Sequence, residues 1–345
     1  MTTKQKYFLI LAPLFALLLV SFRVFYLINL WTYSGPDLLF IINKGDSFAK
    51  INQNLMDQKL ISSGRLFHRY NQYKNSLHKF RTGAFRIQNG QNMLSLYQTL
   101  MYDKSINTLV TIPEGKNIYD IADILEKNQI TTKTEFLQAV RDPILLQKLN
   151  IPFKSAEGYL YPDTYDFTPQ TDAHTIVSEM VRLFRQKIEN VDFSTTHLTP
   201  EQVLILASIV EKETGAKEER PIIAQVFLNR LKLKMRLQSD PTTIYGMYEK
   251  YRGNITKKDL LSPTPYNTYT IAGLPIGPIS NPGIDAVRAV LKPSGDNYLY
   301  FVSKNEGKHI FSDNYTDHLK AVDMWQKNAK NREGKSWRNL NQTSN

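Results

Sequence analysis

The chain has 345 residues, of which 42% are hydrophobic, so it can bury at least one sizeable core and form two or three compact units. It contains no cysteine, which excludes disulfides, thiol nucleophiles and thiolate metal sites. Its formal charge of +11 indicates a surface that attracts polyanions: nucleic acid, anionic lipid or an anionic cell-wall polymer.

An apolar segment at residues 7–28 follows a short N-terminus, residues 1–6. The segment contains one charged residue, Arg23, and is long enough to span a bilayer if that side chain reaches the interface. Lys4 and Lys6 precede it, which predicts a cytoplasmic N-terminus and places the rest of the chain outside the inner (plasma) membrane. We expect an uncleaved single-pass anchor rather than a signal peptide, because no small-residue cleavage site follows. Nucleic acid is then not expected as a partner, and the sequence has no nucleic-acid-binding motif.

One spacing pattern occurs three times after the anchor. An apolar residue stands three positions before a glycine, and further apolar residues stand three, six and ten positions after it; the glycines are Gly45, Gly90 and Gly115. Each copy predicts a strand, a glycine turn and an amphipathic helix, and leaves open whether the copies arose by duplication. We expect residues 38–130 to form a small α+β region.

Helices and short strands are predicted beyond residue 130. The helical segments are 131–150, 174–187, 220–235, 284–291 and 316–328, and the strands are 297–303 and a short one around Ile310. We interpret the aromatic segment 157–165 and the proline-rich segment 262–283 as cleft walls, although each tyrosine fits a core position equally well. Residues 330–345 are polar and basic and predict a disordered tail.

The strongest local signals mark the start of a buried helix. Thr199, Pro200 and Gln202 have the spacing of an N-terminal capping box with proline at the first helical position. The run from 203 to 210 is apolar except for Ser208, so the helix is predicted to be buried on all sides.

Glu211 and Glu213 stand in the last turn of this helix, before Gly215. Burial and the negative end of the helix dipole both raise the pKa of a glutamate at such a position. A glutamate protonated near neutral pH can donate a proton to a glycosidic oxygen. The alternative is a pair of solvated acids. The two side chains point about 200° apart, so one cleft can receive only one of them, and the spacing does not tell which.

Motifs for other chemistries are missing from the sequence. It has no metalloprotease, serine-hydrolase, phosphate-loop or dinucleotide motif, and its six histidines are scattered. We therefore expect carboxylate chemistry.

Several blocks of this sequence resemble the endolytic murein transglycosylases of the YceG-like family. They are ASIVEKET at 207–214, VFLNRL at 226–231 and MRLQSDPT at 235–242, with further blocks at 157–165, 262–269 and 273–283. The blocks keep the family's order, which implies an α+β fold with one transmembrane helix at 7–28, a LysM-like region at 38–130 and a catalytic domain at 131–329. The additional Thr264–Pro265 is a mild departure that affects local loop shape.

The resemblance implies a reaction. Glu211 matches the first glutamate of the family's Glu-Lys-Glu motif and would be the single catalytic acid/base of a lytic transglycosylase, a carbon–oxygen lyase of the EC 4.2.2 class. The enzyme would cleave the bond between N-acetylmuramic acid and N-acetylglucosamine in nascent peptidoglycan and leave a 1,6-anhydromuramyl end. Because no water attacks, no second carboxylate is required, and the resemblance implies no metal and no cofactor. The family also suggests internal cleavage, termination of glycan elongation and association with peptidoglycan synthases (penicillin-binding proteins).

Other side chains are candidates for binding the glycan by hydrogen bonds or by stacking on sugar rings. The candidates are Glu157, Tyr161, Glu213, Asn229, Gln238, Asp240, Tyr266, Asn267 and Asn281. Asp240 is equally well explained as a helix N-cap before Pro241, and Arg230 as an ion-pair partner of Glu213. Two other functions stay open, namely a wall-binding scaffold without catalysis and a hydrolase that uses water.

Overall fold

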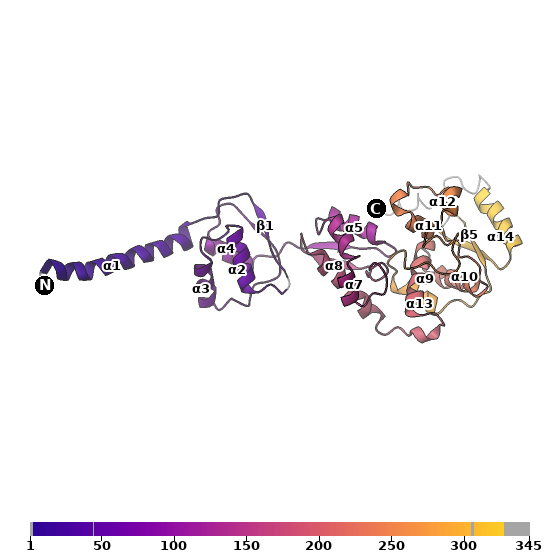
Figure 1. The fold of residues 1–345 in the computed structure, drawn as a ribbon, viewed down its shortest axis with the longest axis horizontal. Coiled ribbons are helices and arrows are strands. Elements are labelled where there is room, and N and C mark those ends of the chain that lie inside the picture. Colours follow the sequence, from indigo (N-terminus) through magenta and orange to yellow (C-terminus); the bar gives the residue numbers. More distant parts are fainter. Residues whose placement is uncertain (1–2, 44, 305–306, 328–345) are drawn as a thin grey trace. The chain divides into compact units, whose positions relative to one another are not determined.

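The computed structural model describes residues 3–43, 45–304 and 307–327, which fall into two compact units (Figure 1). The first unit extends to Leu109 and includes 166–171, and the second contains Val110–Tyr165 and the described chain from Asp172 onward. The third strand-turn-helix copy therefore belongs mainly to the second unit, whereas we predicted a boundary near residue 130. The predicted tail at 330–345 lies outside the described residues.

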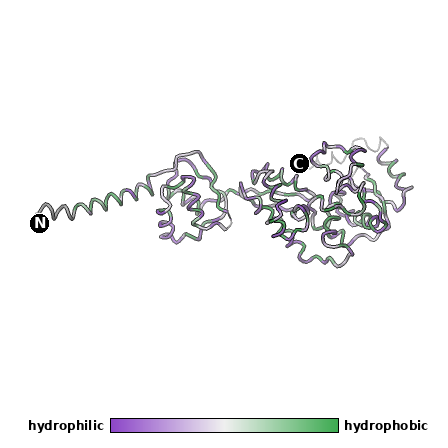
Figure 2. Tube along the Cα trace, viewed as in Figure 1, coloured by the Kyte–Doolittle hydropathy of each residue, from purple (hydrophilic) through white to green (hydrophobic). Residues whose placement is uncertain are grey.

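The first unit begins with the predicted apolar helix. Helix α1 (Thr3–Phe25) continues into a π-helical turn at Tyr26–Leu30. Residues 11–30 have a mean hydropathy of 2.2 and lie outside the protein interior, so this stretch is long and apolar enough to cross a membrane. Figure 2 shows the hydrophobic residues along α1.

Two strands and three helices form the body of the first unit. Strand β1 (Leu38–Ile42) pairs antiparallel with β2 (Gly83–Ile87), and the helices are α2 (Phe48–Asp57), α3 (Gly64–Tyr73) and α4 (Met93–Tyr102). Gly45 and Gly90 have φ values of 91° and 85°, which a residue with a side chain rarely adopts. The predicted strand, glycine turn and helix are therefore confirmed in both copies.

The second unit is mainly helical. Its helices are α5 (Ile118–Lys127), α6 (Lys133–Ala139), α7 (Pro143–Lys148), α8 (Ala173–Ile188), α9 (Pro200–Glu213), α10 (Arg220–Lys232), α11 (Asp240–Gly246), α12 (Lys257–Leu261), α13 (Ile284–Leu291) and α14 (Tyr315–Val322). Strand β3 (Thr108–Thr111) pairs with β4 (Thr164–Phe167), and the division into units falls within both strands. Strand β5 (Tyr300–Ser303) pairs antiparallel with β6 (His309–Ser312). The helix predicted at 131–150 is two helices, because Asp142 caps a new helix that starts with Pro143.

Helix α9 lies at the centre of the second unit. Its predicted capping box is confirmed, since Thr199 accepts from the amide of Gln202 and the Gln202 side chain accepts from the amide of Thr199. Every residue from 203 to 211 is buried, and α9 packs against α10, α11 and α13. Each buried Leu, Ile or Val contributes about 1.5–3 kcal/mol relative to an exposed one, so burial holds this helix in place. The helix ends at Glu213, and both glutamates occupy its last turn as predicted.

Candidate active site

The Glu211 carboxylate lies where the ends of three helices meet. Its side chain, at the C-terminus of α9, is only 4% exposed. Arg220, the first residue of α10, donates from Nη2 to Glu211 Oε1 at 2.6 Å. The amide of Gly283, the residue before α13, donates to Oε2 at 3.0 Å. Both carboxylate oxygens therefore have a donor from a neighbouring helix.

A second carboxylate, which the sequence analysis missed, reaches the same arginine. Glu114 lies in the turn after β3, and its Oε2 accepts from Arg220 Nη2 at 3.2 Å. The Glu114 side chain packs so closely on Gly283 that a Cβ atom at position 283 would lie 1.9 Å from Glu114 Oε1. One weak signal was available, because only the third copy of the repeated pattern has an acidic residue directly before its glycine.

Burial raises the pKa of Glu211 above its ordinary value. The Arg220 guanidinium and the Gly283 amide favour the charged carboxylate and lower the pKa, whereas the negative charges of Glu114 and Asp285 raise it again. The net effect is a raised pKa of Glu211, which is the direction expected for a glutamate at the end of a buried helix. Glu211 can therefore hold a proton at a higher pH than a solvated glutamate.

Two loops enclose Glu211. The amide of Gly115 donates to the carbonyl of Asn281, and the amide of Asn281 donates to the carbonyl of Lys116, each at 2.9 Å. Gly115 has a φ of 74°, and a Cβ atom there would lie 3.4 Å from Glu211 Cγ. Glycine therefore suits this position both by its backbone conformation and by its closeness to the carboxylate.

Glu157 and Asn281, both predicted to bind substrate, tie these loops together. Asn281 accepts from the amides of Gly158 and Leu160 at 2.8 and 2.9 Å, and donates to Glu157 at 2.7 Å. Glu157 also accepts from the amide of Ile118 at 3.0 Å. Burial raises the pKa of Glu157 to about 8. These internal bonds give both side chains a structural role next to Glu211.

Glu213 lies in a different environment from Glu211, as the helical geometry predicted. Its carboxylate accepts from the hydroxyl of Ser239, and burial raises its pKa to about 7. The predicted ion pair with Arg230 is wrong, since Arg230 donates instead to the carbonyls of Leu237 at 2.6 Å and Leu299 at 2.7 Å. The positive charge of Arg230 still lowers the pKa of Glu213, but without a salt bridge between the two side chains.

Three further polar candidates also have partners within the protein. Asn267 is buried and donates to the carbonyl of Ser262 at 2.7 Å, and Asn229 donates to two carbonyls at 2.9 Å. Asp240 accepts from the hydroxyl of Tyr269 at 2.6 Å. Asp240 is the first helical residue of α11 and not its N-cap, so that alternative was wrong by one position.

The remaining candidates differ in their exposure. Gln238 is exposed and has a φ of 51°. Tyr161 is buried beneath Lys187, and Tyr266 is half-buried with its ring centroid 4.8 Å from that of Tyr245. None of these side chains hydrogen-bonds to Glu211, whose described partners are Arg220 and Gly283.

Known proteins resemble this chain over most of its length. The model of the YceG-like family matches residues 40–324. An endolytic murein transglycosylase of Bacillus subtilis is 30% identical, with 82% of this chain and 83% of that protein covered. One of Streptococcus pneumoniae R6 is 29% identical over 81% of this chain, which spans only 57% of that longer protein. The crystal structure of a YceG-like protein of Listeria monocytogenes is 32% identical, with a TM-score of 0.58 and coverage of 83% and 99%.

Proposed function

The chain belongs to the YceG-like family, and from this premise we propose that it is a lytic transglycosylase that cleaves the glycan strands of peptidoglycan. The observation that carries the proposal is the environment of Glu211. Its burial favours the protonated acid, while Arg220 and the Gly283 amide can stabilise the carboxylate that remains after proton transfer. The names of two relatives, both endolytic murein transglycosylases, support this substrate.

In the proposed reaction Glu211 acts twice. It first donates its proton to the oxygen that links N-acetylmuramic acid to N-acetylglucosamine, and the C1–O bond breaks. The Glu211 carboxylate then accepts the proton of the muramyl C6 hydroxyl, whose oxygen bonds to C1. The products are a free N-acetylglucosamine hydroxyl and a 1,6-anhydromuramyl end, so no water is consumed and Glu211 regains its proton.

We also propose where the reaction takes place. The apolar helix α1 supports a single-pass anchor in the inner (plasma) membrane, and Lys4 and Lys6 favour a cytoplasmic N-terminus. The second unit would then meet nascent strands on the outer side of the membrane, cut them internally and end their elongation. Peptidoglycan synthases are the expected neighbours there. We also propose that residues 38–130 bind glycan in a LysM-like way.

A hydrolase that uses water is the second candidate function, because the structure places a second carboxylate near Glu211. Oε1 of Glu211 and Oε2 of Glu114 both accept from Arg220 Nη2, so these oxygens can be no farther apart than the two bond distances combined. Ordinary glycosidases use such a pair either to activate water or to form a covalent intermediate. Their products are heavier than the anhydro form by one water molecule.

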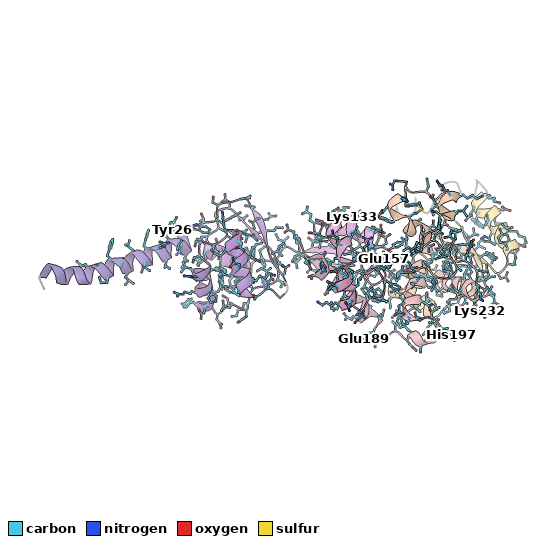
Figure 3. The ribbon with its side chains drawn as sticks, in the orientation of Figure 1. Tyr26, Lys133, Glu157, Glu189, His197 and Lys232 are labelled. Atoms are coloured by element: carbon cyan, nitrogen blue, oxygen red, sulfur yellow. The ribbon has the colours of Figure 1, made fainter. Side chains whose placement is uncertain are left out.

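The proposal is tested by digesting purified peptidoglycan with the full-length protein in detergent and weighing the fragments by mass spectrometry. The wild type should release fragments with anhydro ends, and Glu211→Gln should release none. Glu189→Gln is the matched control, because Glu189 is an exposed glutamate at the end of α8 (Figure 3), and it should match the wild type.

Each other outcome contradicts a specific part of the proposal. Full activity in Glu211→Gln would exclude Glu211 as the acid. Fragments heavier by one water would favour the hydrolase. No cleavage by the wild type would favour a scaffold that binds the wall without cutting it.

A further inference from the structure

Arg220 is shared by two carboxylates that differ in their contact with solvent. The Arg220 side chain is 5% exposed, Glu211 is 4% exposed and Glu114 is 39% exposed. Arg220 donates to both carboxylates from the same atom, Nη2, whereas its buried Nε and Nη1 atoms have no partner in the described structure. The two acids therefore share one donor atom, although Glu211 also accepts from the Gly283 amide.

The net charge of Arg220, Glu211 and Glu114 favours the binding of one proton by this group of three side chains. Two carboxylates and one guanidinium carry a net charge of −1, and one added proton makes the group neutral. Desolvation penalises the buried carboxylate more than the exposed one, so the proton belongs on Glu211 and the charge on Glu114. Glu114 then remains as the partner of Arg220. Without it, a protonated Glu211 would leave a buried cation without a counter-ion, which is strongly unfavourable.

Other charged groups around Glu211 are already engaged. Asp285, on α13, also faces Glu211, but it lies 3.7 Å from both Lys217 and Arg288. Lys212, on α9 itself, donates to the carbonyl of Gly115 at 3.2 Å. Of the acids that face Glu211 from neighbouring elements, Glu114 is the one that shares its arginine.

We propose that Glu114 is a positioning residue that acts through Arg220: by serving as the counter-ion of Arg220, it allows Glu211 to keep the proton that begins the reaction. This inference depends on the proposed function, in which Glu211 is the acid. Glu114 itself transfers no proton. Gly283 is part of the arrangement, because any side chain there would occupy the space of the Glu114 carboxylate.

The test is the pH dependence of kcat/KM on peptidoglycan for full-length wild type, Glu114→Gln, Glu114→Ala and Glu114→Asp. Activity falls at high pH as Glu211 loses its proton. Removing the charge of Glu114 makes that loss easier, so the alkaline limb should move to lower pH in the Gln and Ala variants. At pH 8 we expect both variants to be about three- to ten-fold slower than the wild type, with nearly equal rates at pH 5. Glu114→Asp keeps the charge and should lie closer to the wild type.

An unshifted alkaline limb in a folded neutral variant would overturn the inference. Complete loss of activity at every pH in both neutral variants, with wild-type melting temperatures, would also overturn it, because Glu114 would then take part in the chemistry. Two neutral variants are used so that the test still works if one of them does not fold. Glu211→Gln is measured in parallel to separate the proposed function from the role of Glu114. If Glu211→Gln is active, the proposed function itself has failed.

Discussion

Glu211 and Glu213 end the same helix, and burial raises the pKa of both, but their surroundings differ. Glu211 accepts from a backbone amide and from an arginine that also binds a second carboxylate, whereas Glu213 accepts from a serine hydroxyl. A raised pKa alone does not distinguish them, and the buried Glu157, with a pKa of about 8, joins two loops. The proposed acid/base role of Glu211 therefore depends on the partners of its carboxylate and not on a raised pKa alone.

The largest expected effect comes from Glu211→Gln. Glutamine fills the same space but cannot donate or accept the reacting proton, so kcat/KM should fall by about 10²- to 10⁴-fold. Steady-state release of fragments, with melting curves to confirm folding, measures this effect. A loss of less than tenfold would remove the distinction between the two glutamates.

Gly283→Ala should have the next largest effect. The new Cβ would lie 1.9 Å from Glu114 Oε1 and push that carboxylate away from Arg220, so at pH 8 we expect about a three- to ten-fold loss of activity, as for the neutral Glu114 variants. Gly215→Ala is the matched control, because a Cβ atom there meets no atom within 4 Å. If both variants cleave as fast as the wild type, the packing between Glu114 and Gly283 does not matter for catalysis.

Glu157→Gln should change stability and its pH dependence. Glu157 holds its proton up to a pH of about 8 in the folded protein but only to about 4.3 when unfolded. Its contribution to stability is therefore complete at low pH and is lost as the pH rises toward 8. Glutamine should flatten this fall and lower stability by about 1–3 kcal/mol, because its amide nitrogen cannot accept a bond from Ile118 or Asn281.

Denaturant unfolding of the full chain at pH values from 5 to 8 measures the effect of Glu157→Gln. An unchanged slope of stability against pH would show that Glu157 does not carry a proton in the folded state.

Glu213→Gln should have the smallest effect. A glutamine oxygen can still accept from Ser239, so stability should change by about 1 kcal/mol or less and activity should fall about two- to five-fold. Denaturant unfolding and steady-state release of fragments measure these two effects. A loss equal to that of Glu211→Gln would place Glu213 in the chemistry and contradict the comparison.

Local patterns predicted much of this arrangement. The capping box, the buried face and the end of α9 were readable because they involve residues within one helix. The predicted helix at 284–291 was also found with the same bounds. Periodicity and caps therefore placed both glutamates correctly and showed that they face different surroundings.

Long-range contacts could not be predicted in this way. Arg220 and Glu114 are 106 positions apart, and Asn281 and Glu157 are 124 apart, so only the folded topology brings them together. Arg230 shows the same limit, because its nearest acceptors are backbone carbonyls that no side-chain pattern reveals. The choice of Glu211 over Glu213 came from the family resemblance, and the structure adds the neighbours that give this choice a physical reason.

The most direct test of the central claim is digestion of peptidoglycan in water enriched in ¹⁸O. If Glu211 transfers the proton of the muramyl C6 hydroxyl, the wild-type protein should release anhydro ends with no ¹⁸O, and Glu211→Gln should release no fragments. Reducing ends that carry ¹⁸O would show that water attacks C1 and would contradict the single-glutamate mechanism.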